Sequence, residues 1–264
     1  MNGKGWEWFI KRFEVLSKID LTAYKRPQME RRINSFMRSA GCSDYGSFIE
    51  QLQTDRDLFQ KFLEHITINV SEFFRNTNHW QVLEDTIIPI LLRQRSTLKI
   101  WSAGCSTGEE PYSLAIMTRE KGYDLSDRIL ASDLDTEVLN RAQQGIYAQR
   151  VLQGVPGLTL NKYFVRNGSS FMVKPEIKNL VRFKQHDLLR DPFPRDYDLI
   201  LCRNVVIYFT EETKQNLYRR FTDSLRPGGV LFIGSTEQIF NNRELGLNTV
   251  STFFYQKNDS GKHI

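Results

Sequence analysis

The chain has 264 residues, 40% of them hydrophobic and 25% charged, a composition that is typical of a folded globular protein and excludes an intrinsically disordered one. The apolar run from Ile87 to Leu92 is too short to span a bilayer, and the first residues lack the basic and apolar stretches of a secretory signal. Three scattered cysteines argue against a disulfide framework and a zinc site, and a formal net charge of +5 is too small by itself to indicate a nucleic-acid-binding protein.

The N-terminal part of the chain reads as helices. A helix is predicted over 27–40, where Met29 and Ile33 belong to an apolar stripe at helical spacing. Arg31 and Arg38 project from the opposite side of that helix. Two further helices are predicted over 47–53 and 55–65. These features predict an all-helical domain over residues 1–85, followed by a linker near 86–97.

Strands and helices alternate in the rest of the chain. Predicted strands cover 98–103, 128–133, 181–187, 197–202, 230–234 and 250–256, and predicted helices cover 109–121, 135–144 and 211–225. This alternation predicts an α/β domain over 86–264 with a doubly wound, Rossmann-like parallel sheet. The segment 145–180 fits neither period and carries two short apolar runs around Asn167-Gly168, which predicts a small inserted β-subdomain.

The loop from Ala103 to Glu110 joins the first strand of the α/β domain to its first helix, a position at which open α/β sheets bind ligands. The loop lacks both the G-x-G-x-x-G spacing of a dinucleotide site and the Gly-Lys-Ser/Thr of a phosphate-binding loop. Its two glutamates, Glu109 and Glu110, would repel a pyrophosphate. A nucleoside with a positive centre and no phosphate, such as S-adenosylmethionine, would suit this loop. A tight turn that includes Gly104 and binds no ligand is the alternative.

Asp133 closes the second predicted strand of this domain. A carboxylate at this point can accept hydrogen bonds from both hydroxyls of a ribose. It can also cap the helix that begins near Asp135, and the two roles do not exclude each other. Two further segments carry polar residues next to apolar ones, namely Thr67–Arg75 and Leu201–Phe209. Packed aromatic side chains with charges at the surface are the plainer interpretation of both.

At these residues the sequence strongly resembles the CheR-type chemotaxis receptor methyltransferases, which methylate glutamates of bacterial chemoreceptors with S-adenosylmethionine. The resemblance covers nearly the whole chain and several segments in the same order. They are Thr67–Arg75, Trp101–Tyr112, Ala131–Asp135, Cys202–Phe209 and Leu231–Glu237.

The resemblance implies roles for individual residues. Arg75 and Tyr208 match residues that lie near the reacting methyl group, so they are the predicted catalytic residues. Two positions depart from the family, since Ser71 stands where Thr is usual and Asp187 stands where Asn is common. The predicted cofactor contacts are Asn69, Ser71, Arg75, Gly104, Glu110, Asp133, Asp187, Leu188, Arg203 and Asn204.

The resemblance also implies a partner, the acidic helical region of a chemoreceptor in the cytoplasm. The N-terminal helix that carries Arg31 and Arg38 is the predicted substrate-binding surface, although a solvated basic face is the plainer interpretation. The short turn of the inserted hairpin favours a protein that does not need a tether at the receptor C-terminus. We expect a cytoplasmic monomer that uses S-adenosylmethionine, no metal and no nucleic acid, and that does not insert into the membrane.

Three rival functions remain open at this level. A methyltransferase of the same fold that acts on RNA or a small molecule is one, but Arg203-Asn204-Val205-Val206 stands where such enzymes often have Asn/Asp-Pro-Pro-Tyr/Phe. A binding module that has lost catalysis is the second. An NAD oxidoreductase is the third, and the acidic start of the first helix disfavours it.

Overall fold

The computed structural model describes residues 4–67 and 71–259, and its contacts divide the chain into two units. The first unit contains the described residues of Met1–Asn69 together with Tyr208–Gln215, and the second contains the described residues of Val70–Ile207 and Asn216–Ile264. In the described parts of the chain, no helix is both long and apolar enough to cross a membrane.

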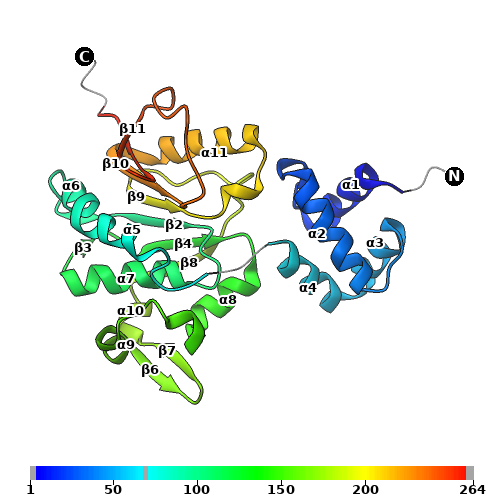
Figure 1. Cartoon of the computed structure of the whole chain (residues 1–264), viewed down its shortest axis with the longest axis horizontal. Coiled ribbons are helices and arrows are strands. Elements are labelled where there is room, and N and C mark those ends of the chain that lie inside the picture. The colour runs from blue at the N-terminus through cyan, green and yellow to red at the C-terminus, as the bar shows by residue number, and fades with distance from the viewer. Residues whose placement is uncertain (1–3, 68–70, 260–264) are drawn as a thin grey trace. The chain divides into compact units, whose positions relative to one another are not determined.

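The first unit is all-helical (Figure 1). Its elements are α1 (Trp6–Ser17), the short 3-10 helix η1 (Leu21–Ala23), α2 (Arg26–Ser39), α3 (Tyr45–Thr54) and α4 (Arg56–Ile66). The helices predicted over 27–40, 47–53 and 55–65 correspond to α2, α3 and α4. No helix was predicted at α1, although its Trp6, Phe9, Ile10 and Phe13 recur at helical spacing and are all buried.

Aromatic rings form the core of this helical unit. Phe9 stacks on Phe13 and on Phe48, with ring centroids 5.8 and 6.0 Å apart. Phe62 meets Phe48 edge-on at 4.9 Å. Because these rings come from three helices, the packing joins α1, α3 and α4 into one unit.

The second unit contains a seven-stranded sheet with the order β11-β12-β10-β9-β2-β4-β8. The five strands from β10 to β8 pair in parallel, whereas β12 pairs antiparallel with β10 and with β11. This arrangement confirms the predicted Rossmann-like sheet. The bounds are β2 (Ile100–Ala103), β4 (Ile129–Asp133), β8 (Val181–Gln185), β9 (Tyr197–Cys202), β10 (Leu225–Ile233), β11 (Leu247–Ser251) and β12 (Phe254–Lys257).

Helices cover both faces of this sheet. Figure 1 shows α7 (Glu109–Lys121) and α8 (Thr136–Gln144) on one face and α11 (Glu211–Ser224) on the other. The linker predicted near 86–97 is mostly helical in the structure, since residues 77–92 form one continuous helical run. This run consists of α5 (Thr77–Val82), a π-helical turn η2 (Leu83–Ile87) and α6 (Ile88–Leu92).

The predicted inserted subdomain is present as a three-stranded antiparallel sheet with the order β5-β7-β6. The prediction of one strand over 250–256 was wrong, because β11 and β12 form an antiparallel pair there and Phe253 between them has φ +71°. The remaining elements are β1 (Thr97–Leu98), β3 (Asp124–Leu125), β5 (Ile146–Ala148), η3 (Gln149–Leu152), α9 (Gly157–Tyr163), β6 (Phe164–Asn167), β7 (Ser170–Val173), α10 (Pro175–Lys178) and η4 (Val206–Tyr208).

Candidate functional site

The loop after β2 lies where the order of the sheet reverses, because β2 pairs with β4 on one side and with β9 on the other. Open α/β sheets bind ligands at such a switch point. The amides of Gly104 and Cys105 both donate to the carbonyl oxygen of Ser132, at 2.8 and 2.9 Å. Gly104 has φ +79°, and a Cβ atom there would collide with Cγ2 of Val205. The loops after β2 and β9 are therefore packed directly against each other.

Asp133 fixes this loop from the end of β4. Its Oδ2 accepts a hydrogen bond from the amide of Ser106 at 2.8 Å, and its Oδ1 accepts one from the amide of Asp135 at 3.1 Å. Burial raises the pKa of Asp133, while these amides lower it. Each carboxylate oxygen can accept a second hydrogen bond, so Asp133 keeps acceptor capacity for the hydroxyls of a ribose. The cap of α8 is Asp135, which accepts from the amides of Glu137 and Val138, so the predicted capping role of Asp133 is wrong.

The two glutamates at the start of α7 have different environments. Glu109 is only 3% exposed, and both of its oxygens accept from the hydroxyl of Thr107 at 2.8 Å. The hydroxyl of Ser71, a predicted cofactor contact, also hydrogen-bonds to Glu109. Burial raises the pKa of Glu109. Glu109 is thus buried and accepts its hydrogen bonds from Thr107 and Ser71, so it differs from Glu110 in its surroundings.

Glu110 is the second of these glutamates, and two residues from the sheet orient its carboxylate. Its Oε1 accepts from the hydroxyl of Ser102 on β2 at 2.8 Å, and its Oε2 lies 3.3 Å from Nη1 of Arg203. Ser102 was not predicted as a site residue, although it is a lone polar residue within an otherwise apolar strand. The three side chains join β2, α7 and the end of β9.

Arg203 is buried, with a relative exposure of 6%. Its Nη2 donates to the carbonyl oxygen of Arg75 at 2.8 Å and to Oδ1 of Asn76 at 3.0 Å, and its guanidinium lies over the ring of Phe232. Burial lowers the pKa of Arg203, although Glu110 raises it. The structure therefore brings Arg203, Glu110 and the backbone of Arg75 together.

The segment around Arg75 has an unusual backbone that several contacts hold. Phe74 and Asn76 have φ +51° and +61°, a conformation that is rare outside glycine. The amide of Phe74 donates to the hydroxyl of Ser113 at 3.0 Å, and the indole nitrogen of Trp80 donates to the carbonyl oxygen of Arg75 at 3.1 Å. Asn69, the predicted contact upstream, lies outside the described residues.

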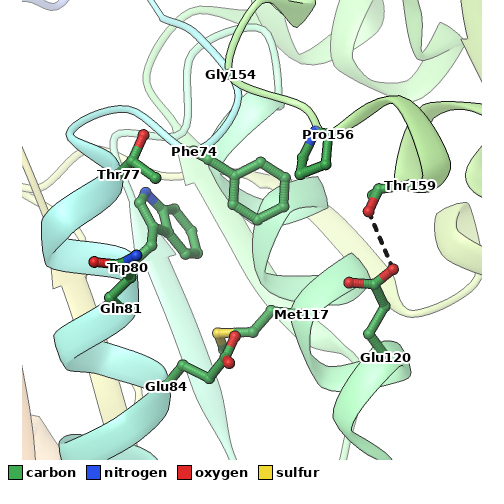
Figure 2. Close-up of a pocket in the computed structure, with 10 residues that line it drawn as sticks. All are labelled: Phe74, Thr77, Trp80, Gln81, Glu84, Met117, Glu120, Gly154, Pro156 and Thr159. Carbon is green, nitrogen blue, oxygen red and sulfur yellow. Dashed lines mark hydrogen bonds between the residues drawn. The ribbon is translucent and has the colours of Figure 1, made fainter.

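Figure 2 shows a cavity beside this segment, in which the rings of Phe74 and Trp80 lie next to Met117. The cavity has a volume of about 170 Å³ and is partly open to solvent. Glu84 and Glu120 also line it, and Glu120 accepts a hydrogen bond from Thr159. None of the predicted cofactor contacts within the described residues lines this cavity, so we do not assign it as the cofactor site.

Asp187 and Leu188 follow β8, the neighbour of β4. The Oδ1 of Asp187 accepts from the amide of Leu189 at 2.8 Å, and the amide of Asp187 donates to Asp191. Leu188 is buried at 9% exposure, and its carbonyl oxygen accepts from Arg220. Asp187 therefore stabilises its own turn, and the contact of Asp187 and Leu188 with an adenine stays a prediction.

The predicted residues Arg31, Arg38 and Tyr208 belong to the first unit. Arg31 and Arg38 are exposed on α2, whereas Met29 and Ile33 on the opposite side are buried. Tyr208 is half-buried, and its carbonyl oxygen accepts from the amide of Lys25 at 2.9 Å. This arrangement leaves the two arginines accessible to a partner.

The side chains at the switch point fit S-adenosylmethionine chemically. Asp133 supplies carboxylate oxygens for ribose hydroxyls, Glu110 supplies negative charge near the start of α7, and the glycine at 104 leaves no Cβ between the loops after β2 and β9. A phosphorylated nucleotide would place negative charge against the carboxylate of Asp133, whereas Arg203 offsets the charge of Glu110. The site therefore suits a nucleoside without phosphates.

Comparisons with known proteins agree with this chemistry. Residues 69–253 match the family model described as "CheR methyltransferase, SAM binding domain", and residues 4–67 match "CheR methyltransferase, all-alpha domain". A protein of Listeria innocua named "Chemotaxis protein methyltransferase" is 47% identical over 240 residues, which cover 90% of this chain and 92% of that one. Proteins of the same name from Listeria monocytogenes and Escherichia coli are 45% and 35% identical, covering 90% and 83% of this chain and 92% and 79% of theirs.

Proposed function

The chain belongs to the CheR methyltransferase family, and from this premise we propose that it methylates glutamate side chains of bacterial chemoreceptors with S-adenosylmethionine. The coarser activity, methylation in chemotaxis that depends on S-adenosylmethionine, belongs to the family. The proposal adds the chemical identity of the acceptor, a carboxylate, and that of the partner, the cytoplasmic helical region of a receptor. The products would be a glutamate methyl ester and S-adenosylhomocysteine.

The observation that carries the proposal is the arrangement of Asp133 and Glu110 around the loop after β2. Asp133 anchors the amide of Ser106 and retains acceptor capacity for a ribose. Ser102 and Arg203 hold the Glu110 carboxylate in one orientation. Asp133, Glu110, Gly104, Arg203 and Asn204 are the residues we propose for holding the cofactor in the described part of this unit, with Ser71, Arg75, Asp187 and Leu188 as further predicted contacts.

When bound, S-adenosylmethionine supplies a methyl group on a positively charged sulfur. An oxygen of the glutamate carboxylate forms a bond to the methyl carbon while the carbon–sulfur bond breaks, and the sulfur keeps the electron pair. A glutamate with an ordinary pKa of about 4.3 is already ionised at neutral pH, so this reaction needs no general base. The protein contributes alignment and exclusion of water, and alignment can lower a barrier by roughly 7–11 kcal/mol.

We propose that Arg75 or Tyr208 positions the acceptor carboxylate. An arginine can bind a carboxylate through two parallel hydrogen bonds, and a tyrosine hydroxyl can donate one. The backbone of Arg75 is held by Trp80 and Arg203, which limits the region that its side chain can reach. This restriction suits a residue that must hold one geometry.

We propose that the receptor binds at α2, through Arg31 and Arg38. Both side chains are exposed, and an acidic helical partner would complement their charge. The protein is expected to act in the cytoplasm as a monomer, without a metal or a nucleic acid. An RNA methyltransferase of the same fold is the alternative acceptor class that the basic face permits.

The experiment that tests the proposal is incubation with S-adenosylmethionine labelled in its methyl group and a purified receptor cytoplasmic domain. We expect label on glutamate that mild base releases, because carboxyl methyl esters hydrolyse readily in alkali. The matched control is the same receptor domain with the labelled glutamates replaced by alanine, which should take up no label. Label that resists base, or label on RNA added in place of the receptor, would contradict the proposed acceptor.

A further inference from the structure

Glu237 lies buried in the turn that follows β10, with a relative exposure of 5%. Its Oε2 accepts a hydrogen bond from the amide of Gly234 at 2.5 Å, and its own amide donates to the carbonyl oxygen of Gly234 at 3.0 Å. Gly234 and Glu237 are thus joined by two hydrogen bonds. These bonds fix the carboxylate of Glu237 at the carboxyl end of β10, which lies beside β9 in the sheet.

The carboxylate also acts on the loop that follows β9. The amides of Asn204 and Val205 both favour its ionised form and lower its pKa. A Cβ atom on Gly234 would lie 2.7 Å from the amide nitrogen of Asn204 and 2.9 Å from Oε2 of Glu237, which is closer than real Cβ contacts. The turn after β10 and the loop after β9 are therefore in direct contact around this one carboxylate.

The loop that Glu237 contacts has a conformation that needs support. Asn204 has φ +59°, which costs free energy in a residue with a side chain, although Asn tolerates it better than most. Next to it, Cγ2 of Val205 occupies the space over Gly104, the glycine of the loop after β2. A change in the loop after β9 would therefore be transmitted to the predicted cofactor-binding loop.

We propose that Glu237 is a positioning residue whose carboxylate holds the Asn204–Val205 turn in the conformation that the cofactor-binding loop requires. The inference rests on the proposed function only through the cofactor, and not through the acceptor. Glu237 acts through the backbone of its neighbours and need not touch the cofactor itself. No sequence pattern distinguished it from the rest of the Leu231–Glu237 segment.

Charges and burial around Glu237 make this support depend on pH. Burial raises the pKa of Glu237 to about 7, against the opposing effects of Arg203 and the three amides of Gly234, Asn204 and Val205. Its Oε1 accepts no hydrogen bond from any described residue, so this oxygen is buried without a hydrogen-bond partner. Two other titratable groups act in this region. The buried Cys202 thiol has a pKa well above its ordinary value, and Glu110 acts on Arg203 from α7.

Protonation of Glu237 removes the charge that the amides of Asn204 and Val205 favour. The turn after β9 is then held less firmly, and binding of the cofactor must restore it. Affinity for the cofactor is therefore expected to rise with pH through about 7. If only the ionised form supports binding, the affinity at pH 6 is about tenfold weaker than at pH 8, following the ionised fraction of a group with a pKa of about 7.

The test compares the full-length wild type with Glu237→Gln and with Glu244→Gln. Gln keeps the shape of the side chain and one acceptor oxygen but does not titrate, and Glu244 is an exposed glutamate further along the same loop. Binding of S-adenosylhomocysteine is measured by calorimetry between pH 6 and pH 8. Melting temperatures measured in parallel show that each variant is folded.

We expect the affinity of the wild type and of Glu244→Gln to rise about tenfold over this range, and the affinity of Glu237→Gln to stay low and nearly constant. The ratio of wild-type to Glu237→Gln affinity isolates Glu237 from every other group that titrates. A ratio that does not change with pH overturns the inference while leaving the proposed function intact. Because no acceptor is present, failure of glutamate methylation leaves this measurement unaffected.

Discussion

Arg203 and Glu110 form an ion pair inside the second unit, with Nη1 of the arginine 3.3 Å from Oε2 of the glutamate. Their side chains are only 2% and 14% exposed. Breaking such a pair by removing one partner leaves a buried charge without compensation. We therefore predict that Arg203→Met lowers the free energy of unfolding by about 3 kcal/mol, measured by urea denaturation.

The matched control is Arg182→Met. Arg182 pairs with Asp127 at 3.3 Å, the same separation, but both side chains are 51% exposed. Exposed pairs contribute about 0–1 kcal/mol, so this variant should remain close to the wild type. Equal losses in the two variants would mean that burial of the Arg203–Glu110 pair does not matter for stability.

The sequence was sufficient to predict the α/β part of the fold because its strands and helices are regular and separated by glycines. The helix over 109–121 and the strand over 197–202 have the predicted bounds. The prediction of strands failed where an alternating sequence pattern contains a turn that the pattern does not reveal. The strand predicted over 250–256 breaks at Phe253, whose positive φ has no signal in a residue type that prefers extended backbone.

The candidate site was less predictable than the fold. Asp133 and Glu110 were predicted as site residues because they lie at the end of a strand or in the loop after one. The sequence does not show that Glu109 turns inward to Thr107 or that Arg203 is buried. Those orientations depend on which partners the tertiary structure brings near. Glu237 shows the same limit, because its partners are backbone amides that any sequence would supply.

Asp133→Asn is predicted to weaken binding of the cofactor. The carboxylate anchors two backbone amides, and hydrogen bonds to a charged group contribute about 1.5–3 kcal/mol. Loss of the charge should weaken S-adenosylhomocysteine binding about 10- to 100-fold in calorimetry. Asp127→Asn, which changes an exposed aspartate near the other end of β4, serves as the control. Wild-type affinity in Asp133→Asn would remove the ribose role.

The variants Gly104→Ala and Gly122→Ala distinguish the cost of backbone strain from the effect of a steric clash. Both glycines have positive φ, +79° and +68°, so alanine costs about 1–2 kcal/mol at either position. A Cβ on Gly122 meets nothing within 4 Å, whereas a Cβ on Gly104 collides with Val205. Gly104→Ala should therefore lose cofactor affinity by about tenfold or more, as expected for displacement of a binding loop. Gly122→Ala should lose stability alone, and equal affinities in the two variants would contradict the predicted role of the loop.

Reversing the charge of Arg31 and Arg38 together should weaken methylation of the receptor without affecting the cofactor. Both residues are exposed on α2, and repulsion between like charges across an interface acts mainly on association. The control reverses Arg56 and Lys61, two exposed residues of α4 in the same unit. We expect a raised KM for the receptor domain in the α2 variant only, and less difference between the variants at high salt. A parallel loss of S-adenosylhomocysteine binding would instead indicate misfolding.

The pKa of Glu237 predicts that stability and cofactor binding change in opposite directions with pH. In the unfolded chain this carboxyl loses its proton near the ordinary value of 4.5, whereas in the folded protein it keeps the proton until about pH 7. Between these values the folded state binds more protons than the unfolded one, so the contribution of Glu237 to stability falls as pH rises. The full effect amounts to about 3 kcal/mol.

Glu237→Gln should remove this dependence. Its free energy of unfolding relative to the wild type is expected to increase by about 3 kcal/mol between pH 4.5 and pH 7.5, measured by urea denaturation at each pH. The variant would then be more stable than the wild type at neutral pH while binding the cofactor less tightly. Such a trade-off is expected where a buried charge is kept for function and not for stability. A relative stability that stays constant over this range would mean that Glu237 has an ordinary pKa in the folded protein. The proposed pH-dependent support of the Asn204–Val205 turn by Glu237 would then also be wrong.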